Sequence, residues 1–241
     1  MNWINFKDKF HVSYHAKIKP FIESPECDKI YDFLKKESGR GKQIAPLSSL
    51  TYRCFQETPL NEIKVVMMGM APYHTKMRTS DGEVVIADGL LMGCSNTNVL
   101  QPSLENFYDG IEKELYNGLT LDHWKNPDVS YLAKQGVFMF NASLTTELNK
   151  AGSHLDVWEP FTTYVLDNIV SHLGVPIIFL GKDAQKFEKN IPPFSWSFTL
   201  SHPASAAYKG TEWDTEGVFT KVSRVLLENN NFKIDWLEKI E

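Results

Sequence analysis

Side chains that can donate or accept hydrogen bonds or exchange protons follow each of four apolar runs in the sequence. The runs span residues 63–68, 137–140, 175–180 and 194–200, and the side chains that follow them are Tyr73 and His74, Asn141, Lys182, and His202. Taken singly, an asparagine after a strand is usually a turn former, and a histidine before proline is usually a hydrogen-bonded loop residue. Together they predict one ligand site, because the carboxyl ends of parallel strands lie along a single edge where ligands bind.

The first of these strand ends has the most restricted backbone. The run 63–68 predicts a short buried strand, which Gly69 and Pro72 break into a rigid turn. This turn presents Tyr73 and His74 at the rim of the predicted sheet, where rigid backbone favours ligand binding. The alternative interpretation is an ordinary exit from a strand into a loop.

The segments between the runs carry helical patterns. We expect helices over residues 25–37, 46–55, 102–116, 158–173, 184–189 and 216–229, and a hairpin over 75–88 that turns at Asp81-Gly82. Residues 205–209 are expected as a loop and residues 1–20 as an arm over the core. The alternation of strands and helices predicts an α/β protein of three layers, α/β/α, with a central four-stranded parallel sheet.

Composition narrows the class of protein. With 241 residues, 42% of them hydrophobic, we expect a single domain over 1–241, in which 1–45 form an N-terminal arm and helix and 75–88 an inserted hairpin. No run reaches the length of a membrane span, so a cytoplasmic protein is expected. The three cysteines lack zinc-site spacing, and we expect no metal and no cofactor. A net charge of −5 argues against a strong sequence-blind DNA binder but leaves room for a small basic footprint.

Several motifs in chain order resemble the uracil-DNA glycosylase superfamily, most closely its bacterial and human branch. The branch motif Gly-Gln-Asp-Pro-Tyr-His stands here as Gly-Met-Ala-Pro-Tyr-His over 69–74. The likeness continues through 89–92, 102–104, 136–145, 153–154, 158–159, 181–185, 201–203, 209–210 and 234–236. The resemblance implies a monomeric DNA glycosylase that hydrolyses the N-glycosidic bond of a flipped-out pyrimidine nucleotide and needs no cofactor.

The resemblance also implies roles for individual residues. His202 matches the histidine that stabilises the departing base, and Asn141 matches the asparagine that reads its Watson-Crick edge. Further residues that match the base pocket are Met70, Ala71, Tyr73, His74 and Met92. Residues that match the DNA grip are Pro102, Ser103, Lys182, Ser205, Ala206, Tyr208 and Lys209.

The pattern departs from the family inside the pocket. Ala71 replaces the aspartate that positions water, Met70 replaces a glutamine, and Met92 replaces the phenylalanine that stacks on uracil. Either a natural substitution or an engineered removal of the aspartate would leave alanine at position 71. Ala206 stands in place of the leucine wedge, and Tyr208 could fill the gap left in the helix.

The inserted hairpin brings three carboxylates near this pocket. They are Asp81, Glu83 and Asp88, of which Asp88 is the first candidate to replace the missing carboxylate; solvated hairpin charges are the alternative. A flexible thioether, a short Ala71 and the hairpin make room for a bulkier pyrimidine, such as the glucosylated hydroxymethylcytosine of some phages, in an anti-phage enzyme. Slow uracil excision is one alternative. A non-catalytic homologue that binds DNA or a protein partner is the other.

Overall fold

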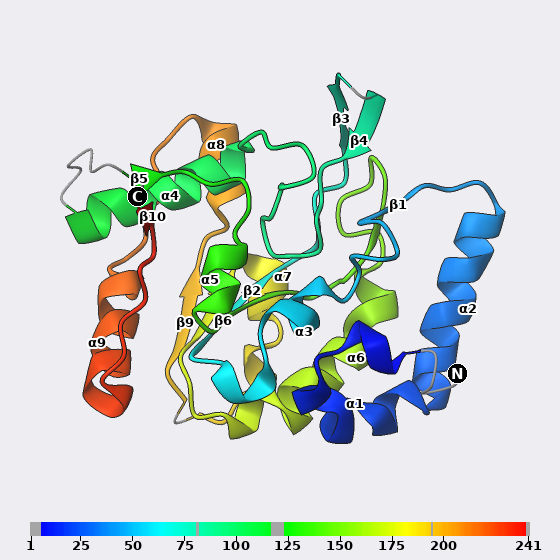
Figure 1. Cartoon of the computed structure of the whole chain (residues 1–241), viewed down its shortest axis with the longest axis horizontal. Helices are drawn as coiled ribbons and strands as arrows, with labels where there is room; N and C mark the ends of the chain where they lie inside the picture. Colours follow the sequence, from blue (N-terminus) through cyan, green and yellow to red (C-terminus); the bar gives the residue numbers. More distant parts are fainter. Residues whose placement is uncertain (1–5, 81, 117–122, 194, 240–241) are drawn as a thin grey trace.

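A four-stranded parallel sheet lies at the centre of the chain (Figure 1). The computed structural model describes residues 6–80, 82–116, 123–193 and 195–239. The strand order is β6-β2-β8-β9, and the strands are β2 (Val65–Gly69), β6 (Val137–Asn141), β8 (Ile177–Leu180) and β9 (Ser197–Leu200). Every neighbouring pair is parallel. All residues of β2, β6 and β8 are buried, as expected for apolar strands that helices cover on both faces.

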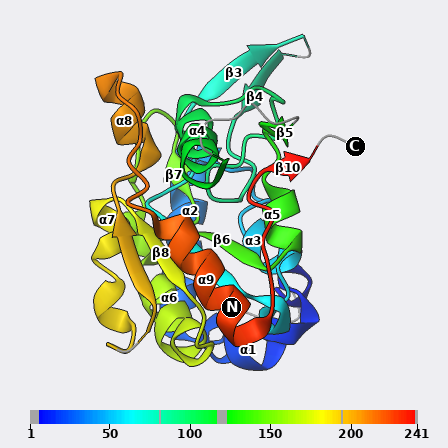
Figure 2. The same ribbon diagram turned by 90° about the vertical axis from the view of Figure 1, so that its left-hand side faces the viewer.

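The helices form a layer on each face of this sheet, which confirms the predicted α/β/α arrangement. Figure 2 shows α9 and α4 in front of the strands and α2 and α6 behind them. The longer helices are α1 (His15–Ile22), α2 (Pro25–Gly39), α4 (Pro102–Tyr116), α6 (Leu155–Asn168) and α9 (Val218–Asn230). Short helices are α3 (Arg53–Glu57), α5 (Ser130–Lys134), α7 (Lys182–Gln185) and α8 (Pro203–Lys209). Among the described residues, no helix combines the length and the apolar character that a membrane crossing requires.

Aromatic packing fixes β6 against the helices behind it. Phe138 and Phe140 lie two residues apart on this strand, so they share one face, and their rings stack at 5.3 Å. Phe55 of α3 contacts both rings edge-on, with centroids 5.2 and 5.9 Å away, and Phe161 of α6 lies 5.7 Å from Phe55. Replacing one such buried ring by alanine costs about 3–5 kcal/mol. This cluster therefore anchors the strand that ends at Asn141.

Some predicted elements have different bounds in the structure. The helix expected over 46–55 is confined to α3, after a series of turns, and the loop expected over 205–209 is part of helix α8. The expected arm contains α1 and two 3-10 turns at Lys7–Lys9 and Val12–Tyr14. Two pairs of two-residue strands were not predicted, β1 (Ile44–Ala45) with β7 (Thr146–Glu147), and β5 (His123–Trp124) with β10 (Glu238–Lys239). Strands this short carry no readable alternation.

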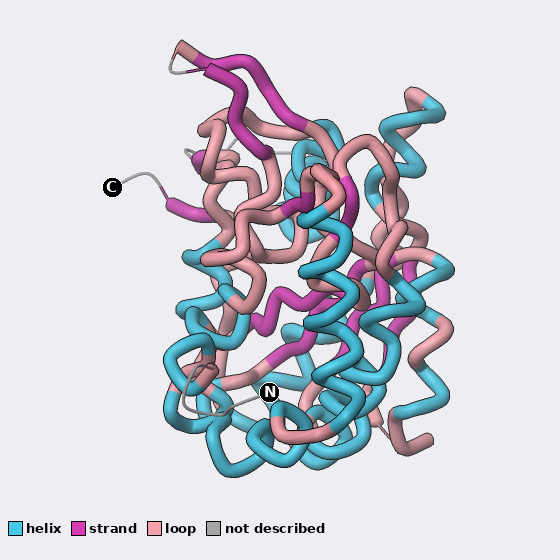
Figure 3. The backbone as a smooth tube through the Cα atoms, turned by 90° about the vertical axis from the view of Figure 1, so that its right-hand side faces the viewer, coloured by secondary structure: helices cyan, strands magenta, loops and turns pink. Residues whose placement is uncertain are grey.

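The inserted hairpin is present where it was predicted. Strands β3 (Lys76–Thr79) and β4 (Gly82–Val85) pair antiparallel, and Figure 3 shows the pair projecting beyond the rest of the chain. Asp81, at the predicted turn, lies outside the described residues.

Candidate active site

A cavity of about 380 Å³ opens at the carboxyl edge of the sheet. It is lined by residues of the turn after β2, the segment after the hairpin, the ends of β8 and β9, and α8. Of the residues predicted for the site, it contains Met70, Ala71, Tyr73, His74, Met92, Ser103, Lys182, His202, Ser205 and Tyr208. Segments more than a hundred residues apart in the sequence thus meet in one hollow.

His202 contributes a neutral imidazole to this cavity. It is the N-cap of α8, and its Nδ1 accepts a hydrogen bond of 3.1 Å from the backbone N–H of Ala204. An accepting Nδ1 carries no proton, so the ring proton is on Nε2. Burial lowers the pKa of His202 to about 4, which keeps the ring uncharged at neutral pH. The ring therefore has one N–H donor to offer a ligand.

Asn141 lies at the edge of the cavity rather than among its lining residues. The strand register places it directly beside Gly69, and its side chain is buried, with Oδ1 lacking a hydrogen-bond partner among the described residues. A Cβ at Gly69 would lie 3.3 Å from this oxygen and 2.3 Å from Cδ1 of Leu91, which does line the cavity. A buried acceptor left unpaired costs about 1–3 kcal/mol, so Oδ1 is suited to accept from a ligand.

Two further residues shape the walls. Tyr73 and Ser103 share a hydrogen bond of 2.7 Å between their hydroxyls, which joins the turn after β2 to the start of α4. Burial raises the pKa of Tyr73 well above its usual value, so the phenol stays neutral. Met92 has a left-handed backbone with φ +58°, a conformation that costs a residue other than glycine about 1–3 kcal/mol. The chain thus uses strained backbone to hold this thioether at the cavity.

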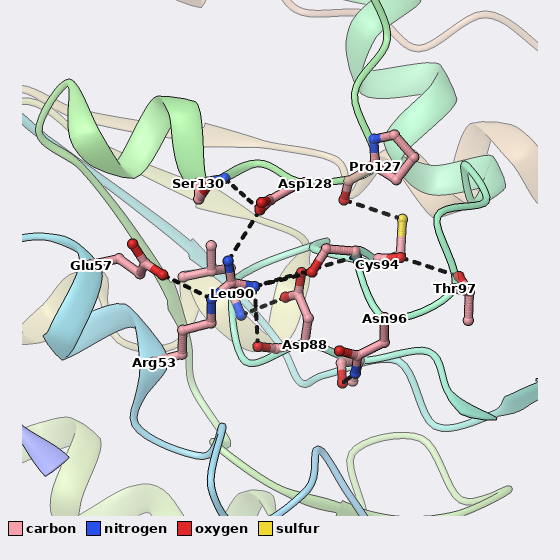
Figure 4. A network of polar contacts seen from close by, with 12 residues as sticks. Arg53, Glu57, Asp88, Leu90, Cys94, Asn96, Thr97, Pro127, Asp128 and Ser130 are labelled. Carbon is pink, nitrogen blue, oxygen red and sulfur yellow. Dashed lines mark hydrogen bonds and ion pairs between the residues drawn. The ribbon is translucent and has the colours of Figure 1, made fainter.

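Asp88 does not supply a carboxylate to the cavity, so this prediction is wrong. It is fully buried, and its oxygens accept from the backbone N–H of Leu90 (3.0 Å) and from the N–H and hydroxyl of Ser95 (3.1 and 2.7 Å). Its Oδ2 also lies 2.9 Å from Nη1 of Arg53 (Figure 4). A Cβ at Gly93 would approach Oδ1 to 2.1 Å, so the turn closes tightly around the carboxylate. Its acceptor positions are used by the protein itself.

Arg53 holds this buried carboxylate from the side of α3. Its guanidinium also reaches Asp128 at 3.1 Å and Glu57 at 3.1 Å. Burial alone would lower the pKa of Arg53, but Asp88 and the other two carboxylates outweigh that effect and raise it. The ion pair stabilises the turn that carries Leu91 and Met92 into the cavity.

The remaining predicted residues are not among those that line the cavity. Pro102 begins α4, Ala206 is buried in α8, and Lys209 is exposed at the end of α8. Glu83 is 71% exposed and pairs with Lys76 at 3.7 Å, as solvated hairpin charges do.

The sequence interpretation missed several lining residues. They are Pro72, Leu91, Ala151, Leu180, Gly181, Asp183 and Ala204. Most are small or apolar and carry no chemical signal. Asp183 was detectable as the neighbour of Lys182, and it is the carboxylate among the lining residues, paired with Lys186 at 2.6 Å.

Curated relatives match nearly the whole chain. A uracil-DNA glycosylase of Pseudomonas aeruginosa is 33% identical over 233 residues, which are 95% of this chain and 94% of the relative. One of Azotobacter vinelandii is 30% identical over 241 residues, 98% of this chain and 97% of the relative. The chain belongs to the uracil-DNA glycosylase family. A scan against protein-family models finds no match.

Solved structures of this family share the fold. A mimivirus uracil-DNA glycosylase superposes with a TM-score of 0.82 at 23% identity, covering 96% of this chain and 89% of that one. The structure of UNG from Nitratifractor salsuginis superposes with a TM-score of 0.58 at 16% identity, covering 88% of this chain and 92% of that one. The curated relatives confirm the predicted superfamily, and these structures confirm the predicted fold.

Proposed function

We propose that this protein is a DNA glycosylase that hydrolyses the N-glycosidic bond of a pyrimidine nucleotide flipped out of DNA. The observation that carries the proposal is the neutral His202, whose Nδ1 is occupied by Ala204 and whose Nε2–H remains for the cavity. Breaking this bond leaves negative charge on the departing base, and a preorganised N–H donor stabilises that charge. The names of the curated relatives support the same reaction.

Base recognition in this proposal involves Asn141 and Tyr73. The unpaired Oδ1 of Asn141 would accept from the Watson-Crick edge of the base. The ring of Tyr73, fixed by its bond to Ser103, would limit what fits beside the base. Ala71 offers only a methyl group where the family pattern has a carboxylate. Stabilisation of the departing base by His202 therefore has to supply a larger share of the rate enhancement.

The grip on DNA is proposed for the rim of the cavity. Lys182 lines it and can donate to phosphate oxygens, as can the Ser103 hydroxyl where Tyr73 is the donor of their shared bond. The hydroxyl of Ser205 also lines the cavity, but it donates to the carbonyl of His202 at 2.7 Å, so Ser205 is proposed to shape this rim. Tyr208 is 87% exposed on α8, and an aromatic ring at that place can stack in the gap that the flipped base leaves. Pro102, Ala206 and Lys209 are proposed to shape the surface around these contacts.

We propose a bulky modified pyrimidine as the preferred substrate, of the kind carried by glucosylated hydroxymethylcytosine in phage DNA, with a role in anti-phage defence. Ala71 and Ala151 leave space in the cavity, and the thioethers of Met70 and Met92 adapt their shape to a ligand. A cavity of about 380 Å³ falls in the range of pockets for ligands larger than a bare base.

Plain uracil is the competing substrate. The 2.7 Å hydrogen bond between Tyr73 and Ser103 favours it, because the ring would have to move to admit a large 5-substituent. The relatives named uracil-DNA glycosylase also favour it.

A parallel assay tests these proposals. Purified protein is incubated with DNA containing uracil and with fully modified phage DNA, and abasic sites are counted in both. We expect more sites in the modified DNA; cleavage of uracil DNA alone refutes the bulky-base proposal. His202→Ala should lower the rate by about 10²–10³-fold, while the control His172→Ala, at an exposed histidine after α6, should not. If the protein binds DNA but forms no abasic sites, and His202→Ala leaves its DNA binding unchanged, it is a non-catalytic homologue.

A further inference from the structure

We propose that the β3–β4 hairpin is a second DNA-binding arm, which contacts the phosphate backbone of duplex DNA beside the flipped nucleotide. It would act on the side of the cavity opposite α8. This inference rests on the proposed function, since it assumes that DNA reaches the cavity.

The hairpin is joined directly to two walls of the cavity. Residues 70–74 precede it and residues 91–92 follow it, and both segments line the hollow. The backbone N–H of Ile86 donates to the carbonyl of Thr75 at 3.2 Å and closes the root of the hairpin. The side-chain amide of Asn96 donates to the carbonyls of Val85 and Ala87, at 3.1 and 2.8 Å. The arm therefore has a fixed origin at the cavity rim.

Beyond that root, the two strands pair only with each other among the described residues. Figures 1 and 3 both show them standing away from the body of the protein. A lone two-stranded hairpin gains little stability from its own contacts. It can, however, lie along a nucleic acid, because a two-stranded ribbon matches the width of the DNA major groove.

Strand β3 carries two cations that can meet a phosphate, although Glu83 stands opposite Arg78 in the strand register. Lys76 and Arg78 lie two residues apart on β3, so their side chains share one face. Lys76 pairs with Glu83, which leaves the exposed Arg78 without an ion-pair partner among the described residues. A guanidinium binds phosphate oxygens through two parallel N–H donors.

Helix α8 and the hairpin lie on different sides of the cavity. Figures 1 and 2 show α8 and the hairpin extending from the same end of the protein, apart from each other. Tyr208 of α8 and Tyr73 of the turn before the hairpin both line the cavity. DNA that inserts a nucleotide there would pass between the two projections.

Duplex binding measured by fluorescence anisotropy tests the arm. The probe is a labelled duplex with a central tetrahydrofuran abasic site, titrated at several salt concentrations. For Arg78→Ala we expect about tenfold weaker binding and a salt slope shallower by about 1. Arg78→Lys should retain the salt slope. The matched control is Arg224→Ala, at an exposed arginine of α9, which should bind as the wild type does.

The outcomes separate this inference from the proposed function. Unchanged affinity and salt slope in Arg78→Ala overturn the arm, as does a wild-type protein that does not bind the duplex. The assay needs no base excision, so weakened binding by Arg78→Ala supports the arm even if no abasic sites form in the substrate assay. If the protein excises bases but Arg78→Ala binds the duplex as tightly as the wild type, the proposed function is supported and the DNA-binding arm is refuted.

Discussion

Replacing Asp88 by asparagine should destabilise the protein without removing a catalytic group. The substitution takes one charge from a buried ion pair and turns an amide N–H₂ toward donors that now bond to the carboxylate. Breaking a buried pair costs about 3–5 kcal/mol. Arg53 keeps Asp128 and Glu57, so we expect a value of about 3 kcal/mol, at the lower end of that range. For a chain of this length, that loss lowers the Tm by about 6–12 °C.

Thermal unfolding and single-turnover kinetics measure the two effects separately. At a temperature well below the lowered Tm, we expect Asp88→Asn to retain excision within about tenfold, because Asp88 does not line the cavity. Asp128→Asn is the matched control, since it removes a partly exposed carboxylate from the same guanidinium. It should cost about 1 kcal/mol or less.

One result would refute this reasoning. A catalytic base typically contributes about 10²–10⁴-fold to a rate. If Asp88→Asn kept the wild-type Tm but lowered the excision rate by that factor, the carboxylate would have to leave its ion pair to act on the substrate.

Three other changes have defined expected outcomes. Tyr208→Ala should lower excision from duplex DNA by about tenfold or more and spare single-stranded DNA, because the lost stacking is worth about 1–3 kcal/mol per base; equal losses on both substrates contradict the wedge role. Ala71→Asp should speed uracil excision by about 10²-fold by restoring a carboxylate beside the sugar, and an unchanged rate would show that water is positioned elsewhere. Burial lowers the pKa of His202 from 6.5 to about 4, so the folded state resists its protonation. Unfolding free energy should therefore fall by roughly 3 kcal/mol between pH 6.5 and 4, and His202→Gln should lack this component in denaturant titrations.

The sheet could be predicted from the sequence because its strands are continuous apolar runs. The four runs correspond to β2, β6, β8 and β9, and the residues that follow them meet at one edge. Burial on both faces removes the polar alternation and leaves a strong local signal. The cavity residues on these strand ends were therefore accessible to prediction, including His202 and Lys182.

The errors came from features that depend on tertiary contacts. Asp88 lies three positions before Leu91, which lines the cavity, yet its side chain turns into the protein because Arg53, 35 positions earlier in the chain, supplies a buried cation. Sequence proximity cannot reveal that partner. Helix α8 was missed for a different reason: Pro203 at its first turn and the His202 side chain at its N-cap are start signals that the motif interpretation passed over.

The loss of a carboxylate at position 71 changes how charge is distributed in the site. Lys182 and Asp183 enter the cavity side by side at the end of β8, and Asp183 is also paired with Lys186. His202 is neutral, so its wall of the cavity presents an N–H dipole rather than a charge. Under the proposed function, such a site would stabilise an anionic base as it leaves and would offer little to a sugar cation. Under the proposed function, the turn that presents Met92 would help to position the base beside the one N–H donor of His202.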